Sequence, residues 1–406
     1  MEEAMASLTK ATRSFLVKRH REFPISSLHL KLYFINTLLC EVGLLVGDTI
    51  NIGLLKDLNL AILDETYNSE CSKEDMLQRA QEIYVLFTAY PSVLRCLTKL
   101  SLQNVAFDKL DMHYILFDCC KQLKHLSLTQ CDISDTSLFK IDAPNSKLCV
   151  LELTECGFVK LEVACLPKLE KFNLDTWFCN YIPLAFGFVP SLGELELAYG
   201  ATCSADQFKL SELIHGTTGI HTLTLDFKGE NLWMQPEMKQ LCTALNKLRK
   251  LFVRGIFVEF DILWMMAFLA AALSIEMLHI EVWEHVCDMD EVSEDFRRRT
   301  NFERRSPQWE MDFDNTNNWI LEELVFIGFR SLEQQFTFIR SVLQRSPNLQ
   351  KIVLKGYEEC IFCATPGVPP SKFPKKDEQE MVMRRTRDGL FSPQIIFDEY
   401  SGRRRR

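Results

Sequence analysis

Two cysteines near the end of the chain, Cys360 and Cys363, have the spacing of half a zinc site. A structural zinc ion takes four ligands, so a complete site of this kind needs a second pair with similar spacing. The sequence offers no such pair. We therefore expect no metal centre and no cofactor, and we interpret this pair as structural or incidental.

Other arrangements that carry catalysis are equally incomplete. The segment from Gly43 to Asp48, GLLVGD, lacks the Lys and the Ser or Thr of a phosphate-binding loop, so we interpret it as ordinary packing. The chain has eight histidines, yet it has neither a nucleophile elbow nor an H-E-x-x-H arrangement. The prediction is a protein that is not an enzyme.

The elements that position the side chains are more informative, because one apolar pattern recurs. Residues 147–158 place Leu148, Leu151 and Leu153 ahead of Cys156 and Phe158. The same three apolar positions recur at Leu97/Leu100/Leu102, Leu123/Leu126/Leu128, Leu169/Phe172/Leu174, Leu192/Leu195/Leu197, Ile220/Leu223/Leu225, Leu248/Leu251/Val253, Ile275/Leu278/Ile280, Leu321/Leu324/Phe326 and Leu349/Ile352/Leu354. Two further copies are proposed upstream, Ile25/Leu28/Leu30 and Leu55/Leu58/Leu60.

The spacing of these copies predicts the fold. From Leu100 to Leu278 the middle positions follow one another at steps of 21 to 28 residues, within the range of about 20–29 residues for leucine-rich repeats. Each copy should form a short strand with its Leu side chains inward, and neighbouring strands should stack into one parallel sheet. We predict an α/β leucine-rich-repeat solenoid with the sheet on the concave side and helices and loops on the convex side. Cys131 and Cys156 should turn inward after their strands.

Residues 1–20 are expected to be an N-terminal segment, 21–357 the solenoid, and 358–406 a C-terminal end with a flexible basic tail. Insertions break the period near 64–92 and near 284–318. The first insertion should contain a helix that Ser72 caps, and the apolar run over 262–273 should be a buried helix. The Pro-rich and polar residues 363–380 should be flexible, and residues 392–400 should add a last strand.

Composition limits the partners. The 406 residues carry a net charge of −9, and the dense basic run is the terminal Arg403 to Arg406, so a nucleic-acid partner is not expected. The apolar run over 262–273 is too short for a membrane span, so no membrane partner is expected either. The first residues do not resemble a secretory signal, so the fifteen cysteines should be reduced. The predicted location is intracellular, either cytoplasmic or nuclear.

The strand residues that alternate with the leucines should face outward and form a partner-binding surface. The candidate contact residues on this concave face are Glu152, Asp175, Glu194, Glu196, Asp226, Lys250, Phe252 and Arg254. The middle of the face is mostly acidic, which favours a protein partner with a partly basic patch. Outward apolar residues such as Phe252, Val325 and Val353 favour an interface. The same positions could instead be simply solvated, or covered by the insertion loop.

Three segments, LTKLSLQNVAF, LKHLSLTQCDI and PKLEKFNLDTW, resemble the repeats of the plant, grass-type F-box/LRR/FBD-like protein family. The C-terminal passages SPNLQKIVLKGYEEC and FPKKDEQEMVMRRTRDGLFSPQIIF resemble that family's closing region. The resemblance covers roughly residues 20 to 400 and implies the substrate-binding region of a ubiquitin ligase receptor, with the Skp adaptor and a cullin as partners. An F-box is not recognisable, because about 24 residues precede the first repeat and lack its Leu-Pro and Trp-Arg features. The alternative is a stand-alone scaffold or inhibitor unrelated to ubiquitin.

Overall fold

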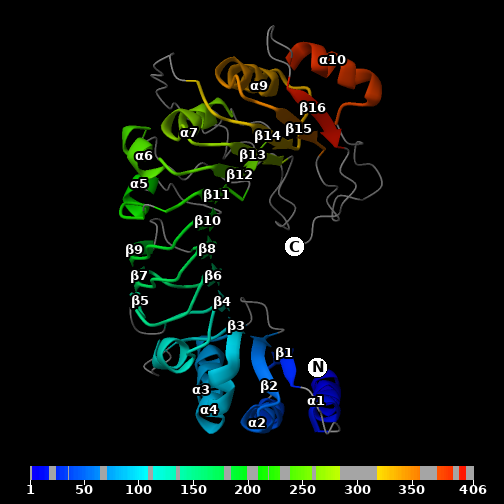
Figure 1. Cartoon of the computed structure of the whole chain (residues 1–406). Helices are drawn as coiled ribbons and strands as arrows, with labels where there is room; N and C mark the ends of the chain where they lie inside the picture. Colours follow the sequence, from blue (N-terminus) through cyan, green and yellow to red (C-terminus); the bar gives the residue numbers. More distant parts are fainter. Residues whose placement is uncertain are drawn as a thin grey trace. The chain divides into compact units, whose positions relative to one another are not determined.

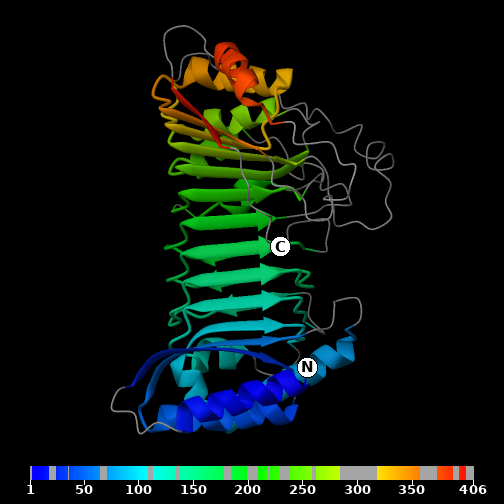
Figure 2. The same cartoon turned by 90° about the vertical axis from the view of Figure 1, so that its right-hand side faces the viewer.

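A computed structural model describes residues 2–17, 24–34, 36–64, 71–107, 113–133, 138–177, 184–198, 209–217, 219–228, 238–257, 262–283, 318–356, 373–386 and 393–398. The chain divides into two compact units, Met1–Leu192 and Gly193–Arg406. Each unit is built on a parallel β-sheet whose strands run in the same direction (Figures 1 and 2).

The sheet of the first unit joins six strands that carry the predicted apolar pattern. In spatial order they are β1 (Ile25–Tyr33), β2 (Leu55–Leu63), β3 (Leu97–Gln103), β4 (His125–Thr129), β6 (Val150–Thr154) and β8 (Lys171–Asp175). The two copies proposed upstream therefore form strands. The expected inward side chains are buried except Leu28 of β1, which is half-buried, and Leu100, Leu126 and Leu151 are fully inaccessible. Register places these leucines directly beside one another.

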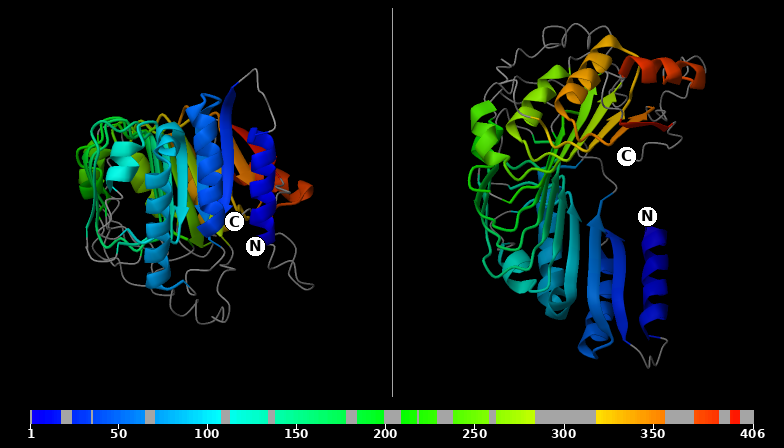
Figure 3. Two further views of the ribbon diagram at one scale, coloured as in Figure 1. Left: turned by 90° about the horizontal axis from the view of Figure 1, so that it is seen from below. Right: turned by 45° about the horizontal axis from the view of Figure 1, so that its top comes forward.

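Helices flank the first strands of this unit. They are α1 (Glu2–Val17), α2 (Asn36–Asn51), α3 (Lys73–Ala89), α4 (Pro91–Cys96) and the short π-helix η2 (Tyr114–Cys119), with α1 against α2 (Figure 3). Ser72 caps α3 as predicted, because its hydroxyl accepts the Asp75 N–H while the Asp75 carboxylate accepts the Ser72 N–H. Gly43 lies in α2, where an added Cβ would come within 2.6 Å of the Leu86 side chain of α3. The glycine of this segment therefore serves packing, as expected.

A second parallel sheet covers the other side of the first unit, where helices were expected. It contains β5 (Phe139–Asp142), β7 (Leu161–Cys165) and β9 (Leu184–Phe188) in that order. The reason lies in repeat length. The repeats around Leu151 and Phe172 step by 21 to 25 residues, which leaves room for an extended return segment but hardly for a helix. Alternating buried residues such as Leu161 and Val163 suit a strand.

The described residues of the second unit form seven parallel strands with helices on one side (Figure 1). Its strands are β10 (Glu194–Ala198), β11 (Thr222–Asp226), β12 (Lys250–Phe257), β13 (Met277–Trp283), β14 (Glu323–Ile327), β15 (Lys351–Lys355) and β16 (Gln394–Asp398). Its helices are α5 (Leu210–Leu213), α6 (Met238–Ala244), η3 (Leu263–Met265), α7 (Met266–Ala271), α9 (Glu333–Arg345) and α10 (Lys376–Thr386). The predicted last strand is confirmed as β16, which pairs with β15. The predicted buried helix over 262–273 is confirmed for Leu263–Ala271, whereas Leu273 lies beyond the helix and is 43% exposed.

The expectation of flexibility over 363–380 is wrong for its last part, since Lys376 begins α10. Acidic residues in the first turn and Arg384 and Arg385 in the last turn complement the helix dipole. Val382 is fully buried, and the Arg385 guanidinium lies 4.1 Å from the centre of the Phe336 ring of α9. These contacts hold α10 beside α9 (Figure 3). The insertion near 284–318 up to residue 317, and the basic tail, lie outside the described residues.

A left-handed residue stands two positions after the third inward side chain of several strands, and it ends all of these strands except β12, which continues past Gly255 to Phe257. In the first unit these residues are Asn104, Gln130, Glu155 and Thr176, with φ between 52° and 57°, and in the second unit they are Gly255 and Gly328. The backbone N–H groups of Asn104, Gln130 and Glu155 extend the ladder; that of Gln130 donates to the Thr154 carbonyl at 2.8 Å. The turn is thus a feature of the repeat, whichever residue occupies it.

Thr176 carries the largest backbone strain of these residues, because a β-branched side chain is disfavoured at φ 57°. Thr176→Asn is expected to raise the free energy of unfolding by about 1 kcal/mol, since Asn tolerates this conformation. Chemical denaturation measures the change. Thr176→Val is the control and should bring no gain. If the Thr176→Asn protein is no more stable than the Thr176→Val protein, the claim that Thr176 is strained is contradicted.

Candidate partner-binding face

The candidate site is the side of each sheet that lies opposite the inward leucines, here called the open face. Figure 2 looks onto this face. Register in the second unit arranges its residues in three rows that cross the strands. The first row is Glu194, Thr222, Lys250, Met277, Glu323, Lys351 and Gln394, and the middle row is Glu196, Thr224, Phe252, His279, Val325, Val353 and Ile396. The third row is Ala198, Asp226 and Arg254, continued beyond a register shift by Glu281, Ile327, Lys355 and Asp398.

The predicted contact residues fall into two groups. Six of them, Glu194, Glu196, Asp226, Lys250, Phe252 and Arg254, lie on the neighbouring strands β10, β11 and β12 of the second unit. Glu152 and Asp175 lie on the neighbouring strands β6 and β8 of the first unit. The structure therefore brings six of the predicted contact residues together on one surface of the second unit. The other two lie on the open face of the first unit.

The two carboxylates of the first unit are engaged by their own neighbours. His125 Nε2 donates to Glu152 Oε2 at 2.8 Å, and this bond, helped by the charges of Lys99 and Lys171, lowers the pKa of Glu152. The Thr176 hydroxyl donates to Asp175 Oδ1 at 2.9 Å. Basic side chains surround Glu152, so this part of the face is less acidic than the outward residues alone indicate.

Ion pairs cross the open face of the second unit. Arg254 Nη1 lies 3.6 Å from Glu196 Oε1, and its guanidinium lies 5.5 Å from the centre of the Phe252 ring. Further along, Lys351 pairs with Glu323 at 2.8 Å and Lys355 pairs with Asp398 at 3.0 Å. Glu194 and Lys250 are exposed. Asp226 Oδ1 accepts the N–H of Lys228, the left-handed residue that follows β11.

The middle row is largely apolar from β12 onward. The Phe252 and His279 rings are tilted against each other with their centroids 5.2 Å apart. Val325 and Val353 are 8% and 6% exposed, so Phe252, His279 and Ile396 supply more of the accessible surface. Register places Val325 beside His279 and Val353 beside Val325. An apolar stripe therefore crosses these strands between two rows that are mostly charged, with Met277 and Ile327 as apolar members of those rows.

His279 is the residue that sequence reasoning missed. Burial, with smaller effects from Arg254 and Lys355, lowers its pKa to about 4, although Glu323 opposes the shift. The ring is therefore neutral near pH 7. Its Nε2 is buried without a hydrogen-bond partner among the described residues. The outward position of His279 was readable from the repeat, but its neutral state depends on strands far away in the sequence.

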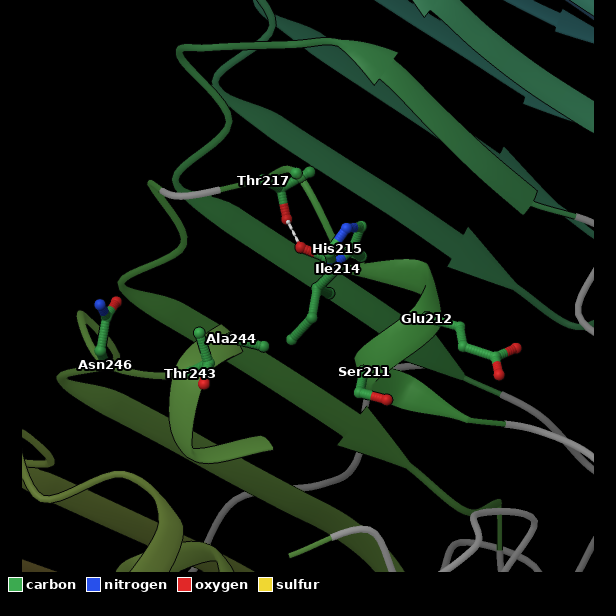
Figure 4. A pocket seen from close by; sticks show the side chains of 9 residues that line it. Ser211, Glu212, Ile214, His215, Thr217, Thr243, Ala244 and Asn246 are labelled. Carbon is green, nitrogen blue, oxygen red and sulfur yellow. Dashed lines mark hydrogen bonds between the residues drawn. The ribbon is translucent and has the colours of Figure 1, made fainter. Parts of the chain in front are cut away.

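A hollow of about 660 Å³ lies on the helix side of the second unit (Figure 4). It is lined by Ser211, Glu212, Ile214, His215, Gly216, Thr217, Thr243, Ala244 and Asn246. Its polar groups do not converge, since Glu212 and Asn246 lie at opposite sides and the Thr217 hydroxyl donates to the Ile214 carbonyl. Small-molecule sites combine an apolar pocket with a few converging polar groups, so this hollow does not resemble one.

No group of three or more potential metal ligands occurs among the described residues, and Cys360 and Cys363 lie outside them. Cys131 and Cys156 point inward as expected: both are buried, and their thiols donate to carbonyls of their own and neighbouring strands. Burial raises the pKa of Cys131 well above the usual thiol value. These cysteines are structural. None of the described helices has the length and hydrophobicity needed to cross a lipid bilayer.

Parallel strands with inward leucines, recurring at 21 to 28 residues, define a leucine-rich-repeat protein of the α/β class. Residues 83–381 match the family model described as "At1g61320/AtMIF1, LRR domain", a span of 299 residues in a chain of 406. The chain therefore belongs to this leucine-rich-repeat domain family of plants. A search of curated proteins finds no match to the chain. Domains of this family are typically interaction modules that carry no catalysis.

Proposed function

We propose that the chain is a non-catalytic recognition module that binds a protein partner on the open face of its second unit. The observation that carries the proposal is the apolar middle row around Phe252 and His279, lying between rows of charges. Binding surfaces of proteins commonly have such an apolar centre with a polar rim. Membership of a leucine-rich-repeat family supports the proposal, since these domains generally bind proteins.

The partner we propose carries a partly basic patch. On β10 and β11 the outward residues include Glu194, Glu196 and Asp226 and no Lys or Arg. Arg254 pairs with Glu196 and so offsets one of these three negative charges. Lys250 lies two strands away from Glu194 in the same row. In the first unit, Glu152 and Asp175 are proposed as secondary contacts. Their carboxylates already accept hydrogen bonds from His125 and Thr176, so we expect them to bind a partner more weakly.

Replacing Phe252 with Ala is expected to weaken partner binding at least about tenfold, because a central aromatic side chain loses its contact area. The measurement is an affinity purification from plant extract with quantitative mass spectrometry of the retained proteins. Phe188→Ala is the matched control, since Phe188 is 61% exposed on β9, outside the open face. Proteins retained equally by all three chains would contradict the proposed surface.

The resemblance to plant F-box proteins supports a narrower proposal, in which the partner is a substrate delivered to a ubiquitin ligase. The same purification tests it. Recovery of the Skp adaptor and a cullin would support coupling to the ligase. Recovery of other proteins that depend on Phe252, without adaptor or cullin, would support the stand-alone scaffold or inhibitor instead.

A further inference from the structure

The open face of the second unit is electrostatically uneven along its length. From β12 onward, Lys351 pairs with Glu323, and Lys355 pairs with Asp398. These pairs neutralise four of the charges that border the apolar middle row. At the other end, Arg254 pairs with Glu196, while Glu194 is exposed and Asp226 is half-buried. The surface thus has an acidic end on β10 and β11 and a neutral, apolar stretch beginning at β12.

The apolar stretch holds one polar group that lacks a partner. His279 stands beside Phe252 in the middle row, and its Nε2 is buried without a hydrogen bond among the described residues. Nε2 is inaccessible, so a ligand on the open face meets other atoms of the His279 ring, which is neutral near pH 7. The rings of Phe252 and His279 together therefore favour an apolar side chain at this point.

The width of the stretch indicates the form of the ligand. Rows on one face of a strand are two residues apart, about 7 Å, and charged rows border the middle row on both sides. An α-helix with its side chains is about 10–12 Å across, so a helix lying along the row would contact Lys250 and Arg254, the charged neighbours of Phe252 on β12. An extended chain presents one line of side chains to the row and leaves more of these two charges in water.

We propose that the partner, if it binds as the proposed function requires, presents an extended segment that crosses β10 to β13 with a basic side chain and an apolar side chain. The basic side chain lies among Glu194, Glu196 and Asp226, and the apolar one lies over Phe252 and His279. The midpoints of these two sites are two strands apart, about 10 Å at a strand spacing near 4.8 Å. An extended chain covers that distance in about three residues, whereas a helix needs about six or seven.

A displayed library of random 12-residue peptides, selected on the full chain, tests the inference. Enriched peptides are expected to carry Lys or Arg about three residues from Leu, Ile, Val, Phe or Met, in either order. The best peptide is then synthesised and its affinity measured by fluorescence anisotropy. Glu194→Lys and Phe252→Ala should each weaken it at least tenfold, and so should replacing its basic residue with Glu. Asp226→Asn should weaken it as well, while the Asn oxygen still accepts the Lys228 N–H.

Two matched variants serve as controls. Glu212→Lys reverses a charge on α5, where the side chain is 69% exposed, and Phe188→Ala removes a ring from β9. Neither should change the affinity. Peptides that depend on Phe252 but tolerate Glu for their basic residue, or that space the two residues by six or seven, would overturn the inference and leave the proposed function standing. Failure to enrich any peptide that depends on Phe252 or Glu194 would overturn both.

Discussion

Replacing Arg79 with methionine is expected to lower the free energy of unfolding by about 3–5 kcal/mol. Arg79 Nη1 of α3 lies 2.7 Å from Asp64 Oδ2 at the end of β2, and the two side chains are 15% and 10% exposed. The Asn104 amide donates to the same carboxylate oxygen at 2.7 Å. Methionine keeps much of the packing volume but leaves Asp64 charged in a site with little water. The cost comes from a buried carboxylate that has lost the Arg79 guanidinium.

Chemical denaturation with a matched control measures this effect. Arg249→Met removes the arginine of an exposed pair, in which Arg249 and Glu276 are 64% and 40% exposed, and should cost under about 1 kcal/mol. Adding Asp64→Asn to Arg79→Met should restore part of the loss, because the neutral amide tolerates burial better. Equal costs for Arg79→Met and Arg249→Met would show that the buried pair contributes no more than a surface pair.

The second large effect concerns pH. His279 has a folded-state pKa of about 4 against an ordinary value of 6.5, so below pH 6.5 the unfolded chain takes up a proton that the folded chain does not. Stability from this residue is complete above pH 6.5 and falls as the pH drops towards 4. Between pH 7 and pH 4.5 the natural chain should lose about 2 kcal/mol more than a His279→Gln variant.

Denaturation curves of both chains at the two pH values measure that difference. Carboxylates elsewhere titrate in the same range, but they are common to both chains and cancel in the comparison. His279→Gln should change stability little at pH 7, where both side chains are neutral. A natural chain that loses no more stability than the variant would mean that His279 is protonated freely in the folded state.

The strands could be predicted from the sequence because their signal is local and repeated. Each copy of the pattern places its leucines at spacing two, which fixes both the strand and its buried side, and all ten copies form strands. The Ser72 cap was predictable for the same reason, since its partner Asp75 stands three residues away.

The second sheet of the first unit was not predicted, although two signals for it were present. Repeats near Phe172 are short, and Leu161 and Val163 alternate with polar neighbours. Helix α10 was missed because the prolines before it suggested a flexible chain, whereas its stability comes from contacts with Phe336 and Glu333 of α9. Those contacts join residues about 50 positions apart, so a local sequence pattern does not reveal them.

The candidate face was only partly predictable. Alternation identified the outward residues, but not the cross-strand bonds that engage them. Arg254 meets Glu196 through the register of three strands, and the pKa of His279 depends on Arg254 and on Lys355, 76 residues further along. Such pairings follow from how the strands align, and only the folded sheet supplies that alignment.

The alternation within each strand separates the residues that pack the core from the residues that form the surface. In β12, Leu251 and Val253 face the core, while Phe252 between them faces the open side. A substitution at the outward position changes the exposed surface and leaves the buried neighbours untouched. Each repeat contributes one residue to the middle row, so specificity can diverge one repeat at a time in related chains. The outward surface of this architecture can therefore change while the packing of its core stays the same.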